Sequence, residues 1–321
     1  MTRPTIIGNR GYRGQYPENT LVAFEQALEA GVDVILTDLQ MSKDGVVVIN
    51  HDQTTQRCWD GDYNIGETEW SMLKTLRSKK LDFPDLRMLT LIDVLKWVVD
   101  HPEVKLMLDI KYTNDQEIML KSVAAMLSVL ESLPFWRKHI IWGLWGVDWF
   151  QYGMETGVVK DFEVVCTTLS LEMAKRFVEF SRNINNPHFR LSAVNVHFVS
   201  TWTSAFQNDM IPYLRENKVQ TYVWTVNRAE DFKQCTALPI TGFVTDHPDE
   251  ALETVSKLQA EEEATFKRPF LLSREGARFY AFLLIYDFID RFFFSSWAQH
   301  KFAGISFSML VVKVLKTAHL I

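Results

Sequence analysis

The chain has 321 residues, 47% of them hydrophobic and 23% charged, which is ordinary for a folded globular protein. This length allows one large domain or two average ones, and a barrel of alternating strands and helices takes about 250 residues and leaves a remainder. The net charge of −6 argues against nucleic acid as a partner of the whole chain.

The first residues run directly into a strand-like segment, so no signal peptide is predicted. Three cysteines, Cys58, Cys166 and Cys235, are odd in number and far apart. Such spacing is typical neither of a disulfide framework nor of a zinc site. We therefore expect buried thiols in a reducing compartment.

Apolar, β-rich runs recur along the chain with helix-like stretches between them. The predicted strands are residues 5–8, 34–40, 106–112, 140–145, 164–169, 193–198, 221–226 and 242–245. The predicted helices are residues 20–31, 90–100, 114–132, 171–182, 203–217 and 248–263. A strand followed by a helix, repeated about eight times, predicts an α/β protein with a closed TIM (β/α)8 barrel. An open doubly wound sheet is the alternative, but no G-x-G-x-x-G or Walker sequence supports it.

One further extended run, residues 46–50, follows Asp44 and Gly45 closely. Asp-Gly between two extended runs is typical of a β-hairpin. This run is therefore expected to be a small hairpin insertion that pairs locally and is not a barrel strand.

The composition changes after Glu263 and becomes aromatic, apolar and cationic. From Lys267 to the end there are eight Lys or Arg and three acidic residues, a local balance of +5. A bilayer-spanning helix needs about 18 uncharged apolar residues in a row, and no run in the sequence is that long. Two amphipathic or hairpin-forming segments, 279–297 and 302–321, favour a membrane-associating tail lying in one leaflet, although helices packed on the outside of the barrel are an alternative. We thus predict a barrel domain at 1–263 and an anchoring tail at 264–321.

Residues at the carboxyl ends of barrel strands converge on one mouth. The predicted ends supply Asn9, Arg10, Leu36, Asp38, Asp109, Lys111, Trp224 and Asp246, and the hairpin supplies His51. Strand alternation places residues 36 and 38 on one face, and likewise 109 and 111. Carboxylates can hold a divalent cation, Arg and Lys can bind phosphate oxygens, and His can transfer protons. The mouth is therefore suited to a phosphoryl group.

The run GNRGYRGQYPENTLVAFEQALEAGVDVILTDLQMSKDGVVVINHD resembles the opening signature of glycerophosphodiester phosphodiesterases. In that family G-H-R-G leads to P-E-N-T, then E-x-D, then D-G-x-x-V-x-x-H-D. LMLDIK resembles the family's third strand and VTDHP its last, so the resemblance covers residues 5–255. The chain with its tail is also similar to fungal phosphatidylglycerol phospholipases C.

The resemblance implies a role for each matching position. Arg10 and Lys111 bind the phosphate, Asp38 and Asp109 bind a divalent cation (Ca²⁺ or Mg²⁺), and His51 is one of two acid–base histidines. Glu18 and Asn19 support the mouth, and Trp224 lines it on the substrate side.

Two positions depart from the family pattern. Asn9 stands where the family has its other catalytic His, and Leu36 stands where it has a metal-binding Glu. An amide does not titrate in the working pH range, and Leu offers no oxygen to a hard cation. Taken alone, Leu36 would simply extend the inner layer of the barrel. Cation binding is expected to be weak, and activity absent or very low.

The implied parent reaction cleaves phosphatidylglycerol to diacylglycerol and glycerol phosphate. One hypothesis is an inactive or impaired member that still folds and docks on membranes. The others are an active phospholipase C with a rearranged site and a non-catalytic lipid-binding module. The expected partners are a phospholipid or glycerophosphodiester and, through the tail, a membrane or lipid-droplet surface. The expected location is intracellular, on a lipid-droplet, endoplasmic-reticulum or mitochondrial surface.

Overall fold

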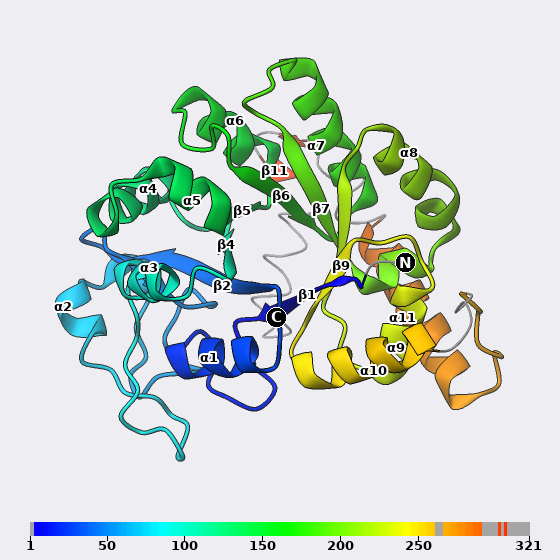
Figure 1. The fold of residues 1–321 in the computed structure, drawn as a ribbon, viewed down its shortest axis with the longest axis horizontal. Helices are drawn as coiled ribbons and strands as arrows, with labels where there is room; N and C mark the ends of the chain where they lie inside the picture. Colours follow the sequence, from blue (N-terminus) through cyan, green and yellow to red (C-terminus); the bar gives the residue numbers. More distant parts are fainter. Residues whose placement is uncertain (1–2, 261–265, 291–300, 303–304, 307–321) are drawn as a thin grey trace.

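A computed structural model describes residues 3–260, 266–290, 301–302 and 305–306. In this described part, eight parallel strands form a ring that closes between β1 and β2 (Figure 1). The strands are β1 (Thr5–Asn9), β2 (Val34–Met41), β4 (Lys105–Ile110), β5 (Ile140–Leu144), β6 (Glu163–Thr168), β7 (Leu191–His197), β8 (Gln220–Trp224) and β9 (Gly242–Thr245). All eight predicted strands and the closed barrel are confirmed, and the open sheet is excluded.

The hairpin insertion is also confirmed. Strand β3 (Val47–Ile49) pairs antiparallel with the end of β2, with Val48 opposite Gln40. Gly45 takes a φ of +81°, in the left-handed region that favours glycine, and so completes the turn. The hairpin extends β2 beyond the barrel wall and carries the chain toward the mouth.

Helices lie outside the ring of strands (Figure 1). They are α1 (Leu21–Glu29), α2 (Trp70–Leu73), α3 (Leu91–Asp100), α4 (Glu117–Val129), α5 (Leu133–His139), α6 (Val147–Glu155), α7 (Leu171–Ile184), α8 (Ile211–Glu216), α9 (Ala229–Thr236), α10 (Pro248–Ala260) and α11 (Arg274–Ile289), with short turns η1 (Ile65–Glu67), η2 (Phe198–Trp202) and η3 (Ala205–Met210). Side-chain caps fix several helix starts; the Thr90 hydroxyl accepts from the Asp93 amide, and the Asp93 carboxylate accepts from the Thr90 amide, at the start of α3. The region predicted as one helix at 203–217 is a π-helical turn, η3, followed by α8.

Strand alternation divides the core into two layers. On β2, Ile35 and Leu39 face the helices, whereas Leu36 belongs to a small cluster inside the barrel. Further along the inner face of β2 and β4, Asp38 lies opposite Asp109 in the register. The apolar interior thus ends where the charged mouth begins.

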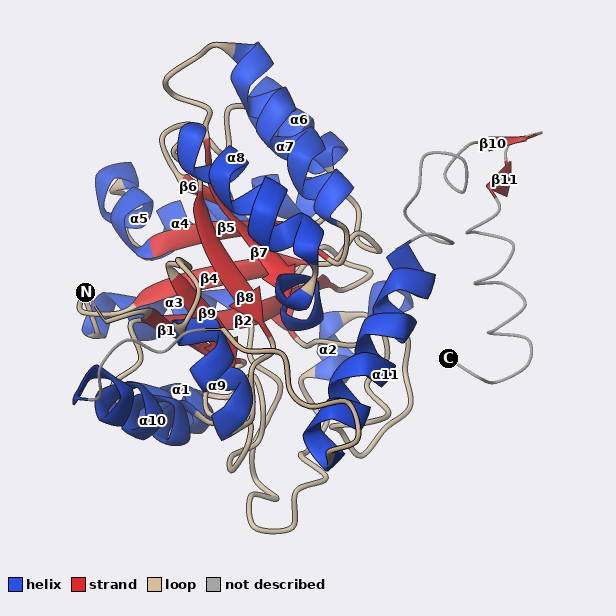
Figure 2. Ribbon diagram, turned by 90° about the vertical axis from the view of Figure 1, so that its right-hand side faces the viewer, coloured by secondary structure: helices blue, strands red, loops and turns tan. Residues whose placement is uncertain are grey.

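The tail predicted at 264–321 lies partly outside the described residues. In the part that is described, α11 lies against the barrel (Figure 2), with Phe279 and Tyr286 buried. Strands β10 (Lys301–Phe302) and β11 (Ile305–Ser306) pair antiparallel. Among the described helices, none alone is long and apolar enough to cross a bilayer; α4 and α5 qualify only as a pair, bent by 116°.

Candidate active site

The loop after β1 brings several predicted residues to the mouth. Arg10 and Asn19 take φ values of 54° and 58°, a region that non-glycine residues seldom occupy. The Arg10 amide donates to the Leu36 carbonyl (2.7 Å), and the Asn19 amide donates to the Arg10 carbonyl (3.0 Å). Gly11 is required between them, because a Cβ there would lie 2.6 Å from the Ala23 carbonyl at the start of α1. These contacts hold the loop against α1 and β2.

Four charged side chains meet at the centre of the mouth. The Lys111 ammonium lies between two carboxylates, 2.9 Å from Asp38 Oδ1 and 2.5 Å from Asp109 Oδ2. Arg10 Nε lies 3.0 Å from Asp38 Oδ2. Two cations therefore balance two carboxylates in a nearly buried cluster.

The electrostatics of this cluster favour the ionised forms of Asp38 and Lys111. Burial alone would raise the pKa of Asp38, but Lys111 and Arg10 outweigh burial and hold that pKa well below its ordinary value. Burial alone would lower the pKa of Lys111, and the neighbouring Asp109 and Asp38 carboxylates instead raise it. At neutral pH Asp38 is therefore a carboxylate and Lys111 an ammonium.

Asn19 and Glu18 support this cluster from the β1–α1 loop. The Asn19 amide donates to Asp38 Oδ2 (3.0 Å), and its oxygen accepts from the Thr37 hydroxyl (2.9 Å). Glu18 accepts from Arg10 (2.9 Å) and, through both oxygens, from Arg57 (2.7 Å each). Asn19 thus contacts Asp38 and Glu18 contacts Arg10, and the supporting role of both residues stays a prediction.

His51 lies at the end of the hairpin, beside the cluster. Its Nδ1 is 2.7 Å from Asp52 Oδ1, and Asp52 in turn accepts from Arg57 Nε at 2.6 Å. The hydrogen bond from His51, together with Arg57, lowers the pKa of Asp52 below its ordinary range. An ionised Asp52 fixes the orientation of the His51 ring and leaves Nε2 as the nitrogen for chemistry.

Asn9 and Leu36, the two departures from the family pattern, are neighbours in the register between β1 and β2. Asn9 Nδ2 donates to Asp246 Oδ1 at 2.7 Å. Leu36 is 5% exposed and packs in the inner apolar cluster with Val34 and Met107. The Asn9 side-chain nitrogen is thus already hydrogen-bonded. The apolar side chain of Leu36 lies beside Asp38 on the inner face of β2.

The residues at the mouth do not fit a divalent cation. In the part of the chain that the structure describes, no group of three or more His, Cys, Asp or Glu is arranged to hold a metal ion. The two nearest carboxylates, Asp38 and Asp109, already share the Lys111 ammonium. In the family pattern a third carboxylate stands at the position of Leu36, which offers no oxygen.

The sequence did not single out three residues of this network. Arg13 contacts Glu18 (3.2 Å) and Asp246 (3.3 Å), Arg57 joins Glu18 to Asp52, and Trp145 Nε1 donates to Asp109 (2.5 Å). Trp145 directly follows β5, and this position at a strand end could have identified it as a residue of the mouth. The Arg57 contact to Glu18 spans 39 residues and has no local signal.

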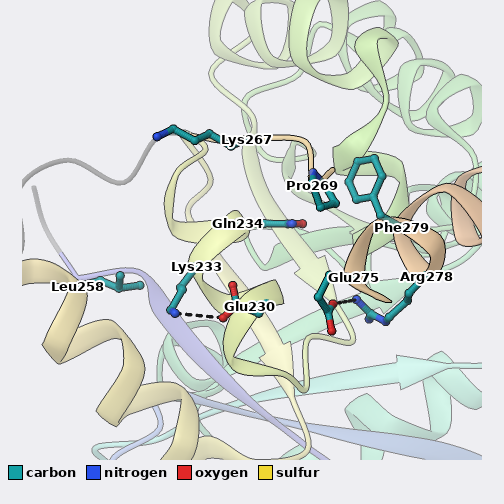
Figure 3. A pocket seen from close by; sticks show the side chains of 9 residues that line it. All are labelled: Glu230, Lys233, Gln234, Leu258, Lys267, Pro269, Glu275, Arg278 and Phe279. Atoms are coloured by element: carbon teal, nitrogen blue, oxygen red, sulfur yellow. Dashed lines mark hydrogen bonds and ion pairs between the residues drawn. The ribbon is translucent and has the colours of Figure 1, made fainter. Parts of the chain in front are cut away.

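One pocket lies beside the mouth, and another lies among the outer helices. One, of about 430 Å³, lies beside the mouth and is lined by Arg13, Glu18, Arg57, Lys79, Lys80 and neighbouring residues. The other, of about 290 Å³, lies between α9, α10 and α11 (Figure 3). Among its charged side chains, Lys233 pairs with Glu230 (3.1 Å), and Arg278 lies 3.9 Å from Glu275.

A family model described as the glycerophosphoryl diester phosphodiesterase family matches residues 10–250. The chain belongs to this family. The match runs from the residue after β1 to beyond β9, and it includes every predicted site residue except Asn9, which precedes it directly.

Relatives of this family member share about a quarter of its residues. Lysophospholipase D GDPD1 of Rattus norvegicus is 24% identical over 284 residues, 79% of this chain and 87% of its own. A glycerophosphodiester phosphodiesterase of Caldanaerobacter subterraneus is 25% identical, over 78% of this chain and 98% of its own. These similarities agree with the family assignment.

Solved structures show the same fold. A phosphodiesterase of Oleispira antarctica, solved in complex with the product sn-glycerol-3-phosphate, has a TM-score of 0.64 at 18% identity and covers 79% of this chain and 97% of its own. A glycerophosphodiester phosphodiesterase of Agrobacterium tumefaciens has a TM-score of 0.62 at 19% identity, with coverages of 78% and 99%.

Proposed function

We propose that this family member binds the phosphodiester of a glycerol-containing phospholipid of the phosphatidylglycerol type, and that it hydrolyses this bond very slowly or not at all. The position of Lys111 between Asp38 and Asp109, beside Leu36, carries the proposal. The ammonium and Arg10 supply positive charge for a phosphate, whereas the carboxylates lack the third oxygen that a cation needs.

The parent reaction explains why two substitutions impair it. A glycerol hydroxyl attacks phosphorus and loses its proton, the bond from phosphorus to the diacylglycerol oxygen breaks, and that oxygen gains a proton. Water then opens the cyclic phosphate to glycerol phosphate. His51, held by Asp52, can serve one proton transfer, but Asn9 cannot serve the other.

A non-catalytic lipid-binding module is the second candidate, because Arg10 and Lys111 are kept in place by carboxylates whether or not chemistry follows. An active phospholipase C with a rearranged site would need its cation ligands or proton donors from elsewhere. Turnover by the unchanged chain separates these alternatives.

We also propose association with a membrane or lipid-droplet surface, such as that of the endoplasmic reticulum or mitochondria. Phe270, Leu271 and Leu272 are 72%, 57% and 85% exposed, next to Lys267 and Arg268. An apolar tip beside cationic side chains suits an anionic lipid surface. Sedimentation of the whole chain with vesicles containing anionic lipid tests this part, and no co-sedimentation would refute it.

The catalytic part is tested by restoring Asn9→His and Leu36→Glu, singly and together. We expect little gain from either single change and a gain of about 10² or more from the pair, because the two groups act as a unit. Release of diacylglycerol and glycerol phosphate from phosphatidylglycerol in mixed micelles is the measurement.

The matched control combines Asn9→His with Leu36→Gln, which has the shape of Glu without its charge. It should stay as inactive as the single variants. A folded double variant that remains inert, or an unchanged chain that already matches it, contradicts the proposal.

A further inference from the structure

A row of aromatic side chains leads away from the charged cluster. The Lys111 ammonium lies 5.3 Å from the ring centre of Trp145. The Trp145 ring contacts the Trp224 ring edge to face, with centroids 5.6 Å apart, and Trp224 contacts His197 in the same way at 5.2 Å. The row therefore begins where a bound phosphate would meet Lys111.

The row continues out to α11. His197 contacts Phe198 at a centroid distance of 4.7 Å, and Phe198 contacts Phe282 at 6.2 Å. Trp145, Trp224 and His197 are half-buried, and Phe282 is 40% exposed. Four of the rings thus remain partly open to a ligand, and the buried Phe198 joins His197 to Phe282. We call this set the aromatic row: Trp145, Trp224, His197, Phe198 and Phe282.

Polar atoms of these rings are already engaged. Trp145 Nε1 donates to Asp109, Trp224 Nε1 donates to the Asn195 carbonyl (3.0 Å), and His197 Nδ1 accepts from the Val199 amide (3.4 Å). Burial lowers the pKa of His197 to about 4, so the imidazole is neutral at neutral pH. The inner part of the row, from Trp145 to His197, therefore offers an uncharged, largely apolar surface directly beside the charged cluster.

Helix α11 is fixed at the outer end of the row. Arg278 pairs with Asp231 through two hydrogen bonds of 2.9 and 2.7 Å, and its guanidinium lies 5.2 Å from the Phe282 ring centre. The Tyr286 hydroxyl donates to the Leu169 carbonyl (2.9 Å), just beyond the carboxyl end of β6. Ile285 and Phe288 follow Phe282 at three-residue spacing, 57% and 56% exposed, and so extend the apolar face.

Helix α11 lies beyond residues 10–250, which the family model matches. We propose that the aromatic row binds the acyl chain of a glycerophospholipid whose phosphodiester lies at Arg10 and Lys111. The occupant follows from continuity, because the ligand must carry an anion at one end and an apolar chain at the other. The inference rests on the proposed function only for the binding of the phosphodiester at Arg10 and Lys111.

The test compares three probes in calorimetric titrations of the full chain. They are decanoyl lysophosphatidylglycerol below its micelle concentration, glycerophosphoglycerol, which lacks the acyl chain, and monodecanoylglycerol, which lacks the phosphate. We expect the lysophospholipid to bind at least tenfold more tightly than glycerophosphoglycerol.

Phe282→Ala removes one ring at the outer end of the row, where the side chain is 40% exposed. It should weaken lysophospholipid binding about three- to tenfold and leave glycerophosphoglycerol binding unchanged. Phe270→Ala is the matched control, since the same side chain is lost from an exposed position outside the row. The Phe270→Ala variant should bind all three probes with the same affinity as the unchanged chain.

Equal lysophospholipid affinities for the unchanged chain and Phe282→Ala, or an equal loss in Phe270→Ala, would overturn the aromatic row as an acyl site. Failure of the proposed function has a different signature. Glycerophosphoglycerol would then not bind, while monodecanoylglycerol would still bind in a manner that depends on Phe282.

Discussion

At the scale of single residues, Lys111 and Leu36 determine what the mouth can bind. The Lys111 side chain supplies the positive charge that lies between the Asp38 and Asp109 carboxylates. Leu36 has no oxygen that could favour a metal ion at this place instead. Two cations and two carboxylates thus balance each other's charge at the mouth.

Asp38→Asn tests the strength of the charged cluster. Removing a nearly buried carboxylate leaves Arg10 and Lys111 without part of their counter-charge, so the free energy of unfolding at pH 7 should fall by about 3 kcal/mol. Because the folded-state pKa of Asp38 is lowered, its stabilisation is present above the ordinary pKa near 3.8 and is lost as the pH falls below it. Denaturant unfolding at pH 7, 4 and 3 should thus show a shrinking difference between variant and unchanged chain.

Asp85→Asn is the control, because the ion pair of Asp85 with Arg77 is exposed. Its effect should stay within about 0.5 kcal/mol at every pH. A difference for Asp38→Asn that does not vary with pH would contradict the assignment of the lowered pKa.

Leu36→Glu tests the missing ligand. The added carboxylate lies near Asp38, so the variant should be less stable than the unchanged chain without added cation. Millimolar Ca²⁺ or Mg²⁺ should then raise its melting temperature by several degrees, since a ligand stabilises the state that it binds. Leu36→Gln should show no such rise, and an equal rise in the unchanged chain would show that other oxygens complete a metal site.

At the scale of elements, the barrel strands were predictable because each is a short apolar run between polar turns. The helices α5, α6 and α9 were not, since they span only Leu133–His139, Val147–Glu155 and Ala229–Thr236, and short runs show little periodicity. The predicted tail began near residue 264, yet α11 packs on the barrel through Phe279 and Tyr286. Because that contact joins parts of the chain that are far apart, no local sequence pattern predicts it.

Two truncations measure the contribution of α11. A chain ending at Asp290 should unfold like the full chain, whereas one ending at Ala260 should lose about 3–5 kcal/mol, because Phe279 no longer covers Trp202 and the pair between Arg278 and Asp231 is gone. Urea unfolding of both proteins is the measurement. Equal stability of the two would show that α11 is an accessory to the barrel.

At the scale of the whole molecule, the motifs predicted which residues meet but not what they contact. Asn9, Arg10, Asp38, Asp109 and Lys111 come together because carboxyl ends of parallel strands share one edge of the barrel. The bridge from Glu18 through Arg57 to Asp52, and the row from Trp145 to Phe282, depend on tertiary packing between segments that are far apart in sequence. Sequence periodicity carries no information on such contacts.

The position of Lys111 has a consequence for sensitivity to the medium. A metal ion is diffusible and can be stripped from a protein by a chelator, but an ammonium attached directly after β4 cannot leave. Treatment with EDTA should thus change neither the melting temperature of the chain nor its affinity for glycerol phosphate. The position of Lys111 thus predicts that anion binding at the mouth does not vary with the free calcium or magnesium around it.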